Sequence, residues 1–542
     1  MNKLFTSTKN LFLSKQKSIF SSALIVALMI VLSRLFGFLR YRTLAGYFTK
    51  EELDIFFASF RIPDIVFEIL ITGALTSSFI PIFIKYQKDK EELNNNISSI
   101  INIITLILFV FILALVIFAG SIIPLITPGF SHEKITQIVY FSRILLVGQL
   151  PFLVFANILT GIGQANKIFI ISAVAPLVYN LVIIAATISF SNSFFLLAPI
   201  IGVVFGASLL FAFQLPLYFS SEFIYKPVMK ITKGLKEFFS LVVPRVITVI
   251  AAQIDATVDL TLTTLLTAGS YTIFYLAQHL QLLPVSVIGI AFGQAALPYL
   301  SEVYQQKNLD EFKKIITESI LSTLFLTVPI MTFFIFARTP LVRLFFGGQK
   351  FDWYATNQTA LTLSYFSLSI PAHSLYYFLT RCFYAFLDSR TPFVISIISI
   401  FLNVLLSLFF IFVLKLPVWA LAVSFSISIS LNVILLLLIL ARKIHGLEHR
   451  LILVESSKIL VATFISSFFV YYFMKMLDGL VFDTTRTINV FLLLATGTTT
   501  YLFLYIFLSW VFGVKEVALL TKFLSKAKEY RKRVVEIYTE VE

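Results

Sequence analysis

Ionisable residues crowd the first two long apolar stretches of this chain: Arg34, Arg40, Arg42, Asp54, Arg61, Asp64 and Glu68. Ionised groups at bilayer depth are costly, so they normally face a partner or a water-filled cavity. Arginine suits phosphate because its planar guanidinium donates paired, charge-assisted hydrogen bonds. The arginines therefore predict a site for an anionic cargo inside a membrane-embedded bundle.

Arg34 and Arg40 flank Gly37 in the first stretch. Six residues along a regular helix separate two side chains by roughly 120°, so the arginines converge only if the helix bends at Gly37. The alternative is that they form structural ion pairs or extend to the water interface. We favour the binding role for both.

The second stretch supplies Asp54 and Arg61. Arg61 and Asp64 are three residues apart and can pair along one helix face. We favour a functional role for Asp54, and functional and structural roles stay equally open for Arg61. Arg42 and Glu68 are assigned to structure.

A second group of polar residues lies further along the chain. Asp255 and Asp259 are four residues apart and share a helix face, which predicts a cation or proton site. Asn403 and Ser407 could add neutral oxygens, a pattern typical of hard cations. The alternative is that the two acids pair with Arg245 on the same helix.

Sequence motifs for enzymatic chemistry are missing. There is no Gly-x-x-x-x-Gly-Lys-Ser/Thr loop for ATP and no His-Glu-x-x-His zinc motif. The single cysteine, Cys382, excludes an internal disulfide. His279 lies within an apolar stretch, where it either packs or, when protonated, joins the anion site. We expect a protein with no cofactor and no enzymatic activity, and Tyr and Phe side chains that are most simply lipid-facing or interfacial.

The composition is that of a helical membrane protein. The chain has 58% hydrophobic and 13% charged residues, against about 25% charged residues in soluble proteins. Its apolar runs are continuous and long enough for helical spans of ~20 residues, rather than for alternating barrel strands. Hydropathy predicts an all-α protein of about fourteen transmembrane helices, at 18–46, 53–85, 98–126, 136–160, 168–190, 194–220, 238–266, 271–303, 315–337, 358–385, 392–414, 417–441, 455–476 and 486–513.

Charged residues in the short loops predict the topology. The net charge of +14 comes from lysines and arginines that concentrate in alternate loops and at both ends. This distribution follows the positive-inside rule, so it places both termini in the cytoplasm and gives no sign of nucleic-acid binding.

Two parts of the sequence resemble each other. A polar turn with Lys167 precedes a span with Asn180, and a turn with Arg390 precedes a span with Asn403, at a shared offset of 223 residues. Such a repeat predicts two six-helix lobes. The expected divisions are the lobes 18–220 and 238–441, a cytoplasmic linker 221–237, two extra helices in 455–513, and a tail 514–542 that is either an amphipathic helix near anionic lipid or a solubilising segment.

Five stretches resemble those of the MurJ (MviN) lipid II flippases of the multidrug/oligosaccharidyl-lipid/polysaccharide exporter superfamily. They are Ser33–Arg40, Asp54–Pro63, Gly73–Pro81, Leu283–Pro298 and Asp388–Pro392. The resemblance runs from about residue 20 to 510. It implies fourteen helices, two lobes around a cationic cavity, and a groove of the last two helices for a polyprenyl tail.

The resemblance also implies roles for single residues. Arg34, Arg40 and Asp54 match positions that the family uses in its cavity. Tyr41 stands where the family often has an acid, and Phe67 stands where many members have an arginine that Arg61 replaces here.

The eighth-span arginine of the family aligns with His279. Some members bind sodium in the second lobe, where Asp259 and Asn403 match and Ser407 replaces an acid.

These features together predict a flippase that moves lipid II from the cytoplasmic to the outer face by alternating access. Arginines would hold the pyrophosphate, and a sodium ion or a proton would reset the lobes. The expected setting is a bacterial plasma membrane, with membrane lipids and the cell-wall synthesis machinery as partners. The rivals are a flippase for another polyprenyl-linked glycan, a cation-coupled multidrug exporter, and a non-transporting scaffold.

Overall fold

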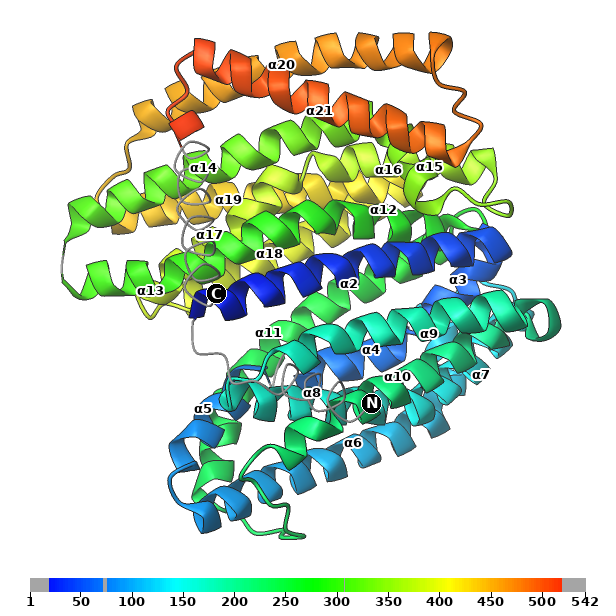
Figure 1. Ribbon diagram of the computed structural model, residues 1–542, viewed down its shortest axis with the longest axis vertical. Helices are drawn as coiled ribbons and strands as arrows, with labels where there is room; N and C mark the ends of the chain where they lie inside the picture. The colour runs from blue at the N-terminus through cyan, green and yellow to red at the C-terminus, as the bar shows by residue number, and fades with distance from the viewer. Residues whose placement is uncertain (1–18, 72–75, 307, 519–542) are drawn as a thin grey trace, which may run out of the picture. The chain divides into compact units, whose positions relative to one another are not determined.

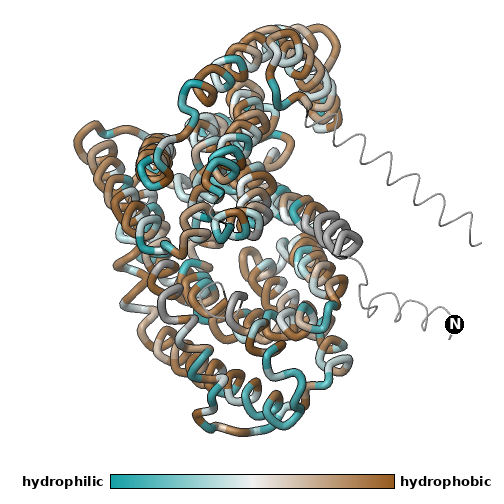
Figure 2. Tube along the Cα trace, turned by 90° about the vertical axis from the view of Figure 1, so that its left-hand side faces the viewer, coloured by the Kyte–Doolittle hydropathy of each residue, from teal (hydrophilic) through white to brown (hydrophobic). Residues whose placement is uncertain are grey.

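The computed structural model describes residues 19–71, 76–306 and 308–518, and no strand occurs among them (Figure 1). Each of the fourteen expected apolar segments coincides with a helix or a short run of helices. Ten helical stretches within the described ranges are long and apolar enough to cross a membrane. Hydrophobic residues are frequent along these helices, with hydrophilic residues among them, as Figure 2 shows. The all-helical membrane fold is confirmed, whereas the count of fourteen crossings stays a prediction.

The chain forms two compact units. The first comprises residues up to Tyr275 together with Phe345–Thr356, and the second comprises Leu276–Leu344 and the chain from Asn357 onward. The six-helix lobes expected from the repeat divide the chain differently and stay a prediction. Of the expected tail 514–542, the part beyond residue 518 lies outside the described residues, as does the chain before residue 19.

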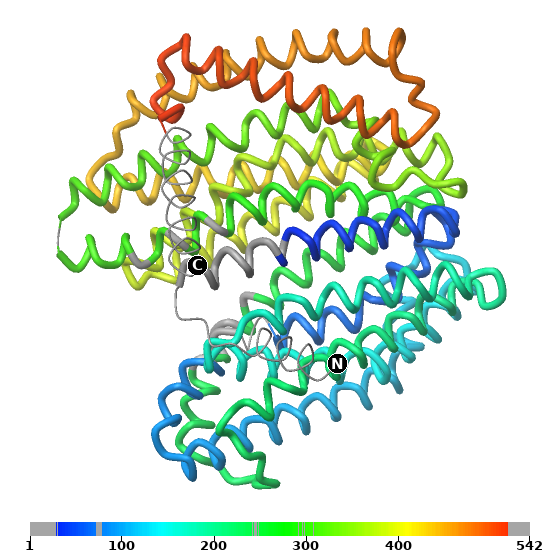
Figure 3. The backbone as a smooth tube through the Cα atoms, viewed as in Figure 1, coloured from blue at the N-terminus to red at the C-terminus, as the bar shows by residue number. Residues whose placement is uncertain are grey.

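Most helices of the first unit follow one another with short connections, and a longer segment joins α10 to α11 (Figure 3). They are α2 (Ile19–Tyr47), α3 (Lys50–Ser59), α4 (Arg61–Glu68), α5 (Thr76–Tyr86), α6 (Lys90–Ile126), α7 (His132–Gly148), α8 (Leu150–Ala165), α9 (Ile170–Phe194), α10 (Leu197–Phe219) and α11 (Lys233–Thr264).

The second unit holds most of the remaining elements, and the boundary between the units falls inside the helix that begins at Ser270. The elements are α12 (Ser270–Pro284), η2 (Val285–Ile290), α13 (Ala291–Gln305), α14 (Leu309–Phe336), α15 (Arg338–Phe346), α16 (Trp353–Ser367), α17 (Ile370–Ala385), α18 (Arg390–Leu408), η3 (Phe409–Val413), α19 (Trp419–Lys443), α20 (His449–Leu480) and α21 (Thr487–Val511). Both η elements are π-helical, a local widening that is rare in ordinary helices.

Side-chain caps define several helix starts. Thr49 accepts from Glu52 N while the Glu52 carboxylate accepts from Thr49 N, a capping box at α3. Asp89 accepts from two backbone N–H groups at the start of α6. These short polar residues satisfy donors that the first helical turn leaves free.

Small residues allow α9 and α10 to pack closely. A Cβ atom on Gly202 would lie 2.6 Å from the Cβ of Ala186, and one on Gly206 would lie 3.1 Å from the carbonyl oxygen of Tyr179. Glycines four residues apart form the stripe through which membrane helices approach one another.

Two helix ends share a backbone pattern. Ile168 N donates to Gly163 O after α8, and Asp388 N donates to Phe383 O after α17. Lys167 and Leu387 occupy the left-handed conformation in these turns, at φ 62° and 59°. Matching positions in these two turns are 220 residues apart. This spacing is three residues shorter than the 223 residues that separate Lys167 from Arg390.

Candidate functional site

Asp54 anchors the start of α12. Its carboxylate accepts hydrogen bonds from Gly269 N at 2.7 Å, from Thr272 N at 2.8 Å and from the Thr272 hydroxyl at 2.9 Å. The side chain is fully buried. A carboxylate bonded to free N–H groups at a helix start is stabilising. Both oxygens are engaged, so this geometry gives Asp54 a positioning role, and its contact with cargo stays a prediction.

Gly269 makes this anchor feasible. Its φ of +86° is a conformation that favours glycine, and an added Cβ would lie 2.5 Å from the Lys50 side chain. Lys50 in turn donates to Asp352 at 2.8 Å. Partial burial alone would raise the pKa of Asp352, but hydrogen bonds from Lys50 and from Ala355 N bring that pKa below its usual range.

Arg61 fastens α4 to α11. Its Nε donates to the Thr257 hydroxyl at 3.1 Å, and one terminal nitrogen donates to the Gln253 side-chain oxygen at 2.9 Å and to the Gln253 carbonyl. The residue is 9% exposed. Within the described ranges no ion pair joins Arg61 to Asp64, so the expected pairing along one helix face is wrong. The long side chain instead reaches neutral oxygens on another helix, and no carboxylate among the described residues forms an ion pair with it.

Arg40 has unused hydrogen-bonding capacity. Its side chain is half-buried, and its Nε is buried without a hydrogen-bond partner in the described part of the chain. The guanidinium carbon lies 4.7 Å from the centre of the Tyr41 ring, close enough for a cation–π contact. Arg34, six residues earlier on α2, is exposed. Of these two arginines, Arg40 is the one held in a partly enclosed setting.

Aromatic residues surround this region of the first unit. Tyr275 stacks on Phe57 with ring centres 4.3 Å apart, and its hydroxyl lies 3.5 Å from that of Tyr41. Tyr41 and Tyr271 are each 8% exposed. The lipid-facing interpretation is therefore wrong for these tyrosines, because the rings pack into the helical interior. One residue of the sequence indicated this arrangement: Tyr41 stands where the MurJ (MviN) family often has an acid.

The candidate cation-site residues fall in two places. Asp255 and Asp259 lie on α11 in the first unit, where Asp255 is half-buried and Asp259 is buried. Asn403 and Ser407 are buried on α18 in the second unit. The Ser407 hydroxyl lies 2.6 Å from the Ser424 hydroxyl on α19. No group of three or more His, Cys, Asp or Glu residues able to hold a metal ion occurs in the described ranges.

His279 is half-buried on α12 and belongs to the second unit. The other four candidate binding residues belong to the first unit: Arg34, Arg40, Asp54 and Arg61. The structure thus brings Asp54 and Arg61 into defined contacts with α11 and α12 and leaves Arg40 with an unpaired donor. Gln253 stood out in the sequence only as a polar residue beside Asp255 and Asp259, and Thr257 and Thr272 gave no recognisable sequence signal.

An apolar pocket of about 420 Å³ lies in the second unit. Its walls come from α12 with η2, from α14 and from α21. Pro284, Phe325, Phe333, Tyr501 and Tyr505 are among the lining residues. The resemblance implied a groove formed by the last two helices, α20 and α21. Residues of α21 line this pocket, and no residue of α20 is among its lining residues.

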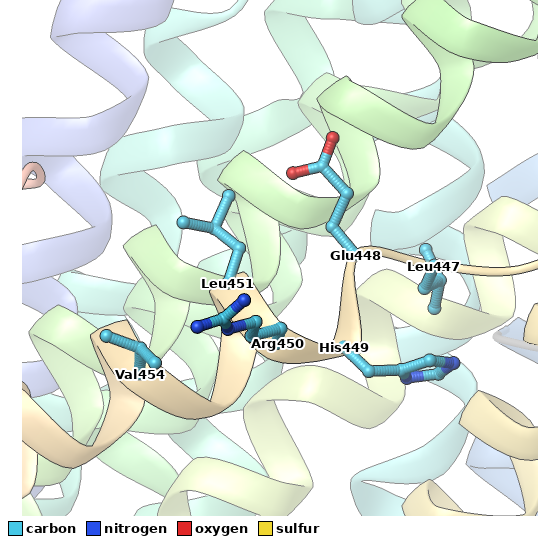
Figure 4. A pocket seen from close by; sticks show the side chains of 6 residues that line it. All are labelled: Leu447, Glu448, His449, Arg450, Leu451 and Val454. Atoms are coloured by element: carbon cyan, nitrogen blue, oxygen red, sulfur yellow. The ribbon is translucent and has the colours of Figure 1, made fainter.

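A second hollow lies at the connection between α19 and α20 (Figure 4). It measures about 770 Å³ and is lined by one continuous segment that includes Glu448, His449 and Arg450. Figure 4 shows these three side chains pointing in different directions. They therefore do not form a converging site for catalysis or metal binding.

The described helices form a membrane-type helical fold, and this fold is shared with solved membrane transporters. A solved structure of a lipid II flippase MurJ in an inward closed conformation matches with a TM-score of 0.74 at 24% identity, covering 90% of this chain and 99% of that one. An inward-facing MATE family multidrug transporter matches with a TM-score of 0.66 at 13% identity, covering 76% and 94%. At these identities the two structures establish the fold.

Sequence comparison establishes the family. The family model described as lipid II flippase MurJ matches residues 45–514. The chain belongs to the lipid II flippase MurJ family, which confirms the resemblance drawn from the motifs. A relative from Buchnera aphidicola subsp. Acyrthosiphon pisum (strain APS), named a probable lipid II flippase MurJ, is 27% identical over 399 residues, covering 71% of this chain and 77% of the relative. The family is one of transporters, in agreement with the expectation of a transporter.

Proposed function

We propose that this chain moves lipid II, the undecaprenyl-pyrophosphate-linked peptidoglycan precursor, from the cytoplasmic to the outer face of a bacterial plasma membrane. The observation that carries this proposal is the family match over residues 45–514. Alternating access of a two-lobed helical transporter provides the movement. Both termini lie in the cytoplasm, as the loop charges predict.

The cargo's pyrophosphate binds at the arginines of α2, with Arg40 as the principal contact. An unpartnered, buried guanidinium nitrogen supports this assignment, because leaving such a donor unsatisfied is costly without a ligand or water. A phosphate oxygen would accept from that nitrogen in a charge-assisted hydrogen bond. Arg34, which is more exposed than Arg40, adds positive charge at the protein surface. Asp54 and Arg61 hold the surrounding helices in position.

The cargo's polyprenyl tail lies in the apolar pocket of the second unit. Phe325, Phe333 and Leu502 line a wall that offers no charged group to the tail. Burying hydrocarbon there is favourable by about 25 cal/mol for each Å² removed from water. The tail can also stay in the lipid, so the pocket contributes to affinity rather than to the crossing of the head group.

A sodium ion or a proton resets the transporter. Buried Asp259 is the principal candidate in the first unit, with Asp255 beside it, and buried Asn403 with Ser407 is the candidate in the second. Translocation by Asp259→Asn should lose its dependence on an imposed sodium or proton gradient. A variant that keeps the full dependence would remove Asp259 from the coupling mechanism.

Translocation of labelled lipid II in reconstituted vesicles tests the proposed function. Arg40→Ala should lower the initial rate at least about tenfold, because a charge-assisted hydrogen bond is worth about 1.5–3 kcal/mol. Arg143→Ala is the matched control, since Arg143 is exposed on α7 and donates to the Val116 carbonyl. Undiminished transport by Arg40→Ala would remove Arg40 from the binding site, and no lipid II transport by the unaltered protein would overturn the proposal.

A flippase for another polyprenyl-linked glycan is the second candidate. It would use the same arginines to bind an anionic group, because every such cargo carries a polyprenyl phosphate or pyrophosphate. Competition separates the two. An excess of unlabelled lipid II should suppress transport more strongly than an equal excess of a polyprenyl pyrophosphate that carries a different sugar.

A further inference from the structure

A strap that is neither helix nor strand, residues 222–232, connects α10 to α11 in the first unit (Figure 3). Side chains from the start of α6 hold its backbone. Asn94 Oδ1 accepts from Ile224 N, Ser98 Oγ accepts from Lys226 N, and Asn102 Nδ2 donates to Val228 O, each at 2.9 Å. Backbone groups that would otherwise need water are thereby satisfied, which fixes the strap without a helix or a sheet.

The fixed strap presents apolar and basic side chains in alternation. Ile224, Met229 and Ile231 are 63%, 62% and 77% exposed. Lys226 is half-buried and Lys230 is exposed between them. Single exposed apolar residues are ordinary on a protein surface, but three on one clamped segment interleaved with lysines match the pattern of interfacial membrane-binding segments.

The length of α6 places the strap near the lipid headgroups. The helix has 37 residues, or roughly 55 Å at 1.5 Å per residue, whereas the hydrocarbon core is about 30 Å thick. The strap is bonded to α6 between Asn94 and Asn102, roughly 6–18 Å from the helix start. The excess length is roughly 25 Å, and α6 begins with Lys90, Glu91 and Glu92, so we expect this part of α6 to extend beyond the hydrocarbon core to the depth of the phosphate groups.

The local charge is positive. Glu222, at the beginning of the strap, forms an ion pair with Lys90 at 3.5 Å. Glu237, just beyond the strap, forms an ion pair with Lys85 at 2.7 Å. Lys230 on the strap and Lys233 at the start of α11 are exposed without an ion pair in the described residues. Their charges are available to an anionic surface.

We propose that the strap is a binding site for anionic phospholipid headgroups of the leaflet it faces. Lys226, Lys230 and Lys233 bind the phosphate groups, while Met229 and Ile231 enter the boundary between headgroups and acyl chains. The clamp from α6 holds these side chains outward before lipid arrives, so little conformational entropy is lost on binding. This site is separate from the transport site, and its test does not measure transport.

A fluorescent label on the strap tests the proposal in full-length protein. Cys382→Ala removes the only cysteine, and Met229→Cys then carries an environment-sensitive dye. We expect a blue shift and quenching by brominated lipid in nanodiscs that contain phosphatidylglycerol, and a smaller response in pure phosphatidylcholine. Adding Lys230→Gln and Lys233→Gln should weaken the phosphatidylglycerol response about fivefold for each lysine, from roughly 1 kcal/mol per lysine near an anionic surface.

Lys88→Gln is the matched control, because Lys88 is exposed on the turn before α6 and is not part of the strap. It should leave the response unchanged. An equal loss with Lys88→Gln would mean diffuse attraction and would overturn the proposal, as would a label that bromine does not quench in either lipid. Inorganic phosphate added to phosphatidylcholine nanodiscs should cause no shift; a full shift would assign the lysines to soluble anions instead.

Discussion

At the scale of single residues, two arginines of the first unit play opposite parts. Arg61 donates hydrogen bonds from two of its three nitrogens to Gln253 and Thr257, whereas Arg40 keeps a buried nitrogen without a partner in the described chain. Arg61→Ala should lower the free energy of unfolding by about 2–3 kcal/mol, because it removes hydrogen bonds from a charged donor and leaves buried acceptors unpaired. Thermal unfolding in detergent measures this loss.

Two further variants separate stability from binding. Arg61→Lys should recover only part of the stability, since an ammonium cannot reproduce the fork of a guanidinium. Arg40→Ala should change the unfolding temperature little while it reduces lipid II transport. If Arg61→Ala unfolds at the temperature of the unaltered protein, its contacts with α11 contribute no stability and Arg61 becomes a candidate for the cargo site.

Asp388 gives a pH-dependent contribution at a connecting turn. Partial burial would raise its pKa, but hydrogen bonds from Lys443 and from the backbone and hydroxyl of Thr391 lower that pKa to about 2. An unfolded aspartate has a pKa of about 3.9, so the folded protein gains stability above pH 4 and loses it as the pH falls from 4 through 2. Asp388→Asn should remove roughly 1 kcal/mol at neutral pH, a value reduced by the exposure of Lys443. Below pH 4, the free energy of unfolding should depend less on pH in the variant than in the unaltered protein. The same pH dependence in both proteins would contradict the low pKa of Asp388.

At the scale of elements, the end of α17 carries a residue in an unfavourable conformation. Leu387 has φ 59° and is 93% exposed. A non-glycine residue in the left-handed region costs about 1 kcal/mol, and an exposed side chain returns little of that cost through packing. Leu387→Gly should therefore raise the free energy of unfolding by about 1 kcal/mol, measured by thermal unfolding. Leu387→Ala, which keeps the Cβ atom, should be near neutral, and stabilisation by alanine alone would point to the side chain instead of the backbone.

Hydropathy predicted where helices lie because each apolar stretch is long and bounded by charged loops. It did not predict α15, whose nine residues include Arg338 and Arg343 and are too short for a span. It also read 53–85 as one segment, although α3 ends at Ser59 and α4 begins at Arg61. Helix breaks of this kind depend on local hydrogen bonds that average hydropathy does not record.

The contacts of the candidate site were less predictable than its residues. Arg61 and Gln253 are 192 positions apart, and Asp54 and Gly269 are 215 apart. A charged residue in an apolar stretch indicates that some partner exists, but the partner's identity depends on tertiary packing. The neutral oxygens of Gln253 and Thr257 carry no charge pattern, so an acid nearby in the sequence looked like the natural partner of Arg61.

At the scale of the whole molecule, the motifs indicated the family because they combine arginines, which are costly inside apolar helices, with glycines and prolines at particular spacings. The family model then matched residues 45–514, although the Buchnera relative is only 27% identical. The lobes, the coupling ion and the number of crossings rest on the arrangement of many helices, and they stay predictions. A property that the complete transporter would show is the response of its cargo to voltage.

Lipid II carries negative charge on its pyrophosphate, so its outward movement should depend on membrane potential. A potential of 100 mV is worth about 2.3 kcal/mol for each elementary charge, or roughly forty-fold in an equilibrium ratio. In vesicles with a potassium diffusion potential, labelled lipid II should leave the negative side faster than it leaves the positive side. The initial rate at which the label becomes accessible measures this difference, and an ionophore that collapses the potential is the control. Equal rates under both polarities would mean that arginines or a co-moving cation neutralise the cargo throughout its crossing, because a neutral complex gains nothing from the field.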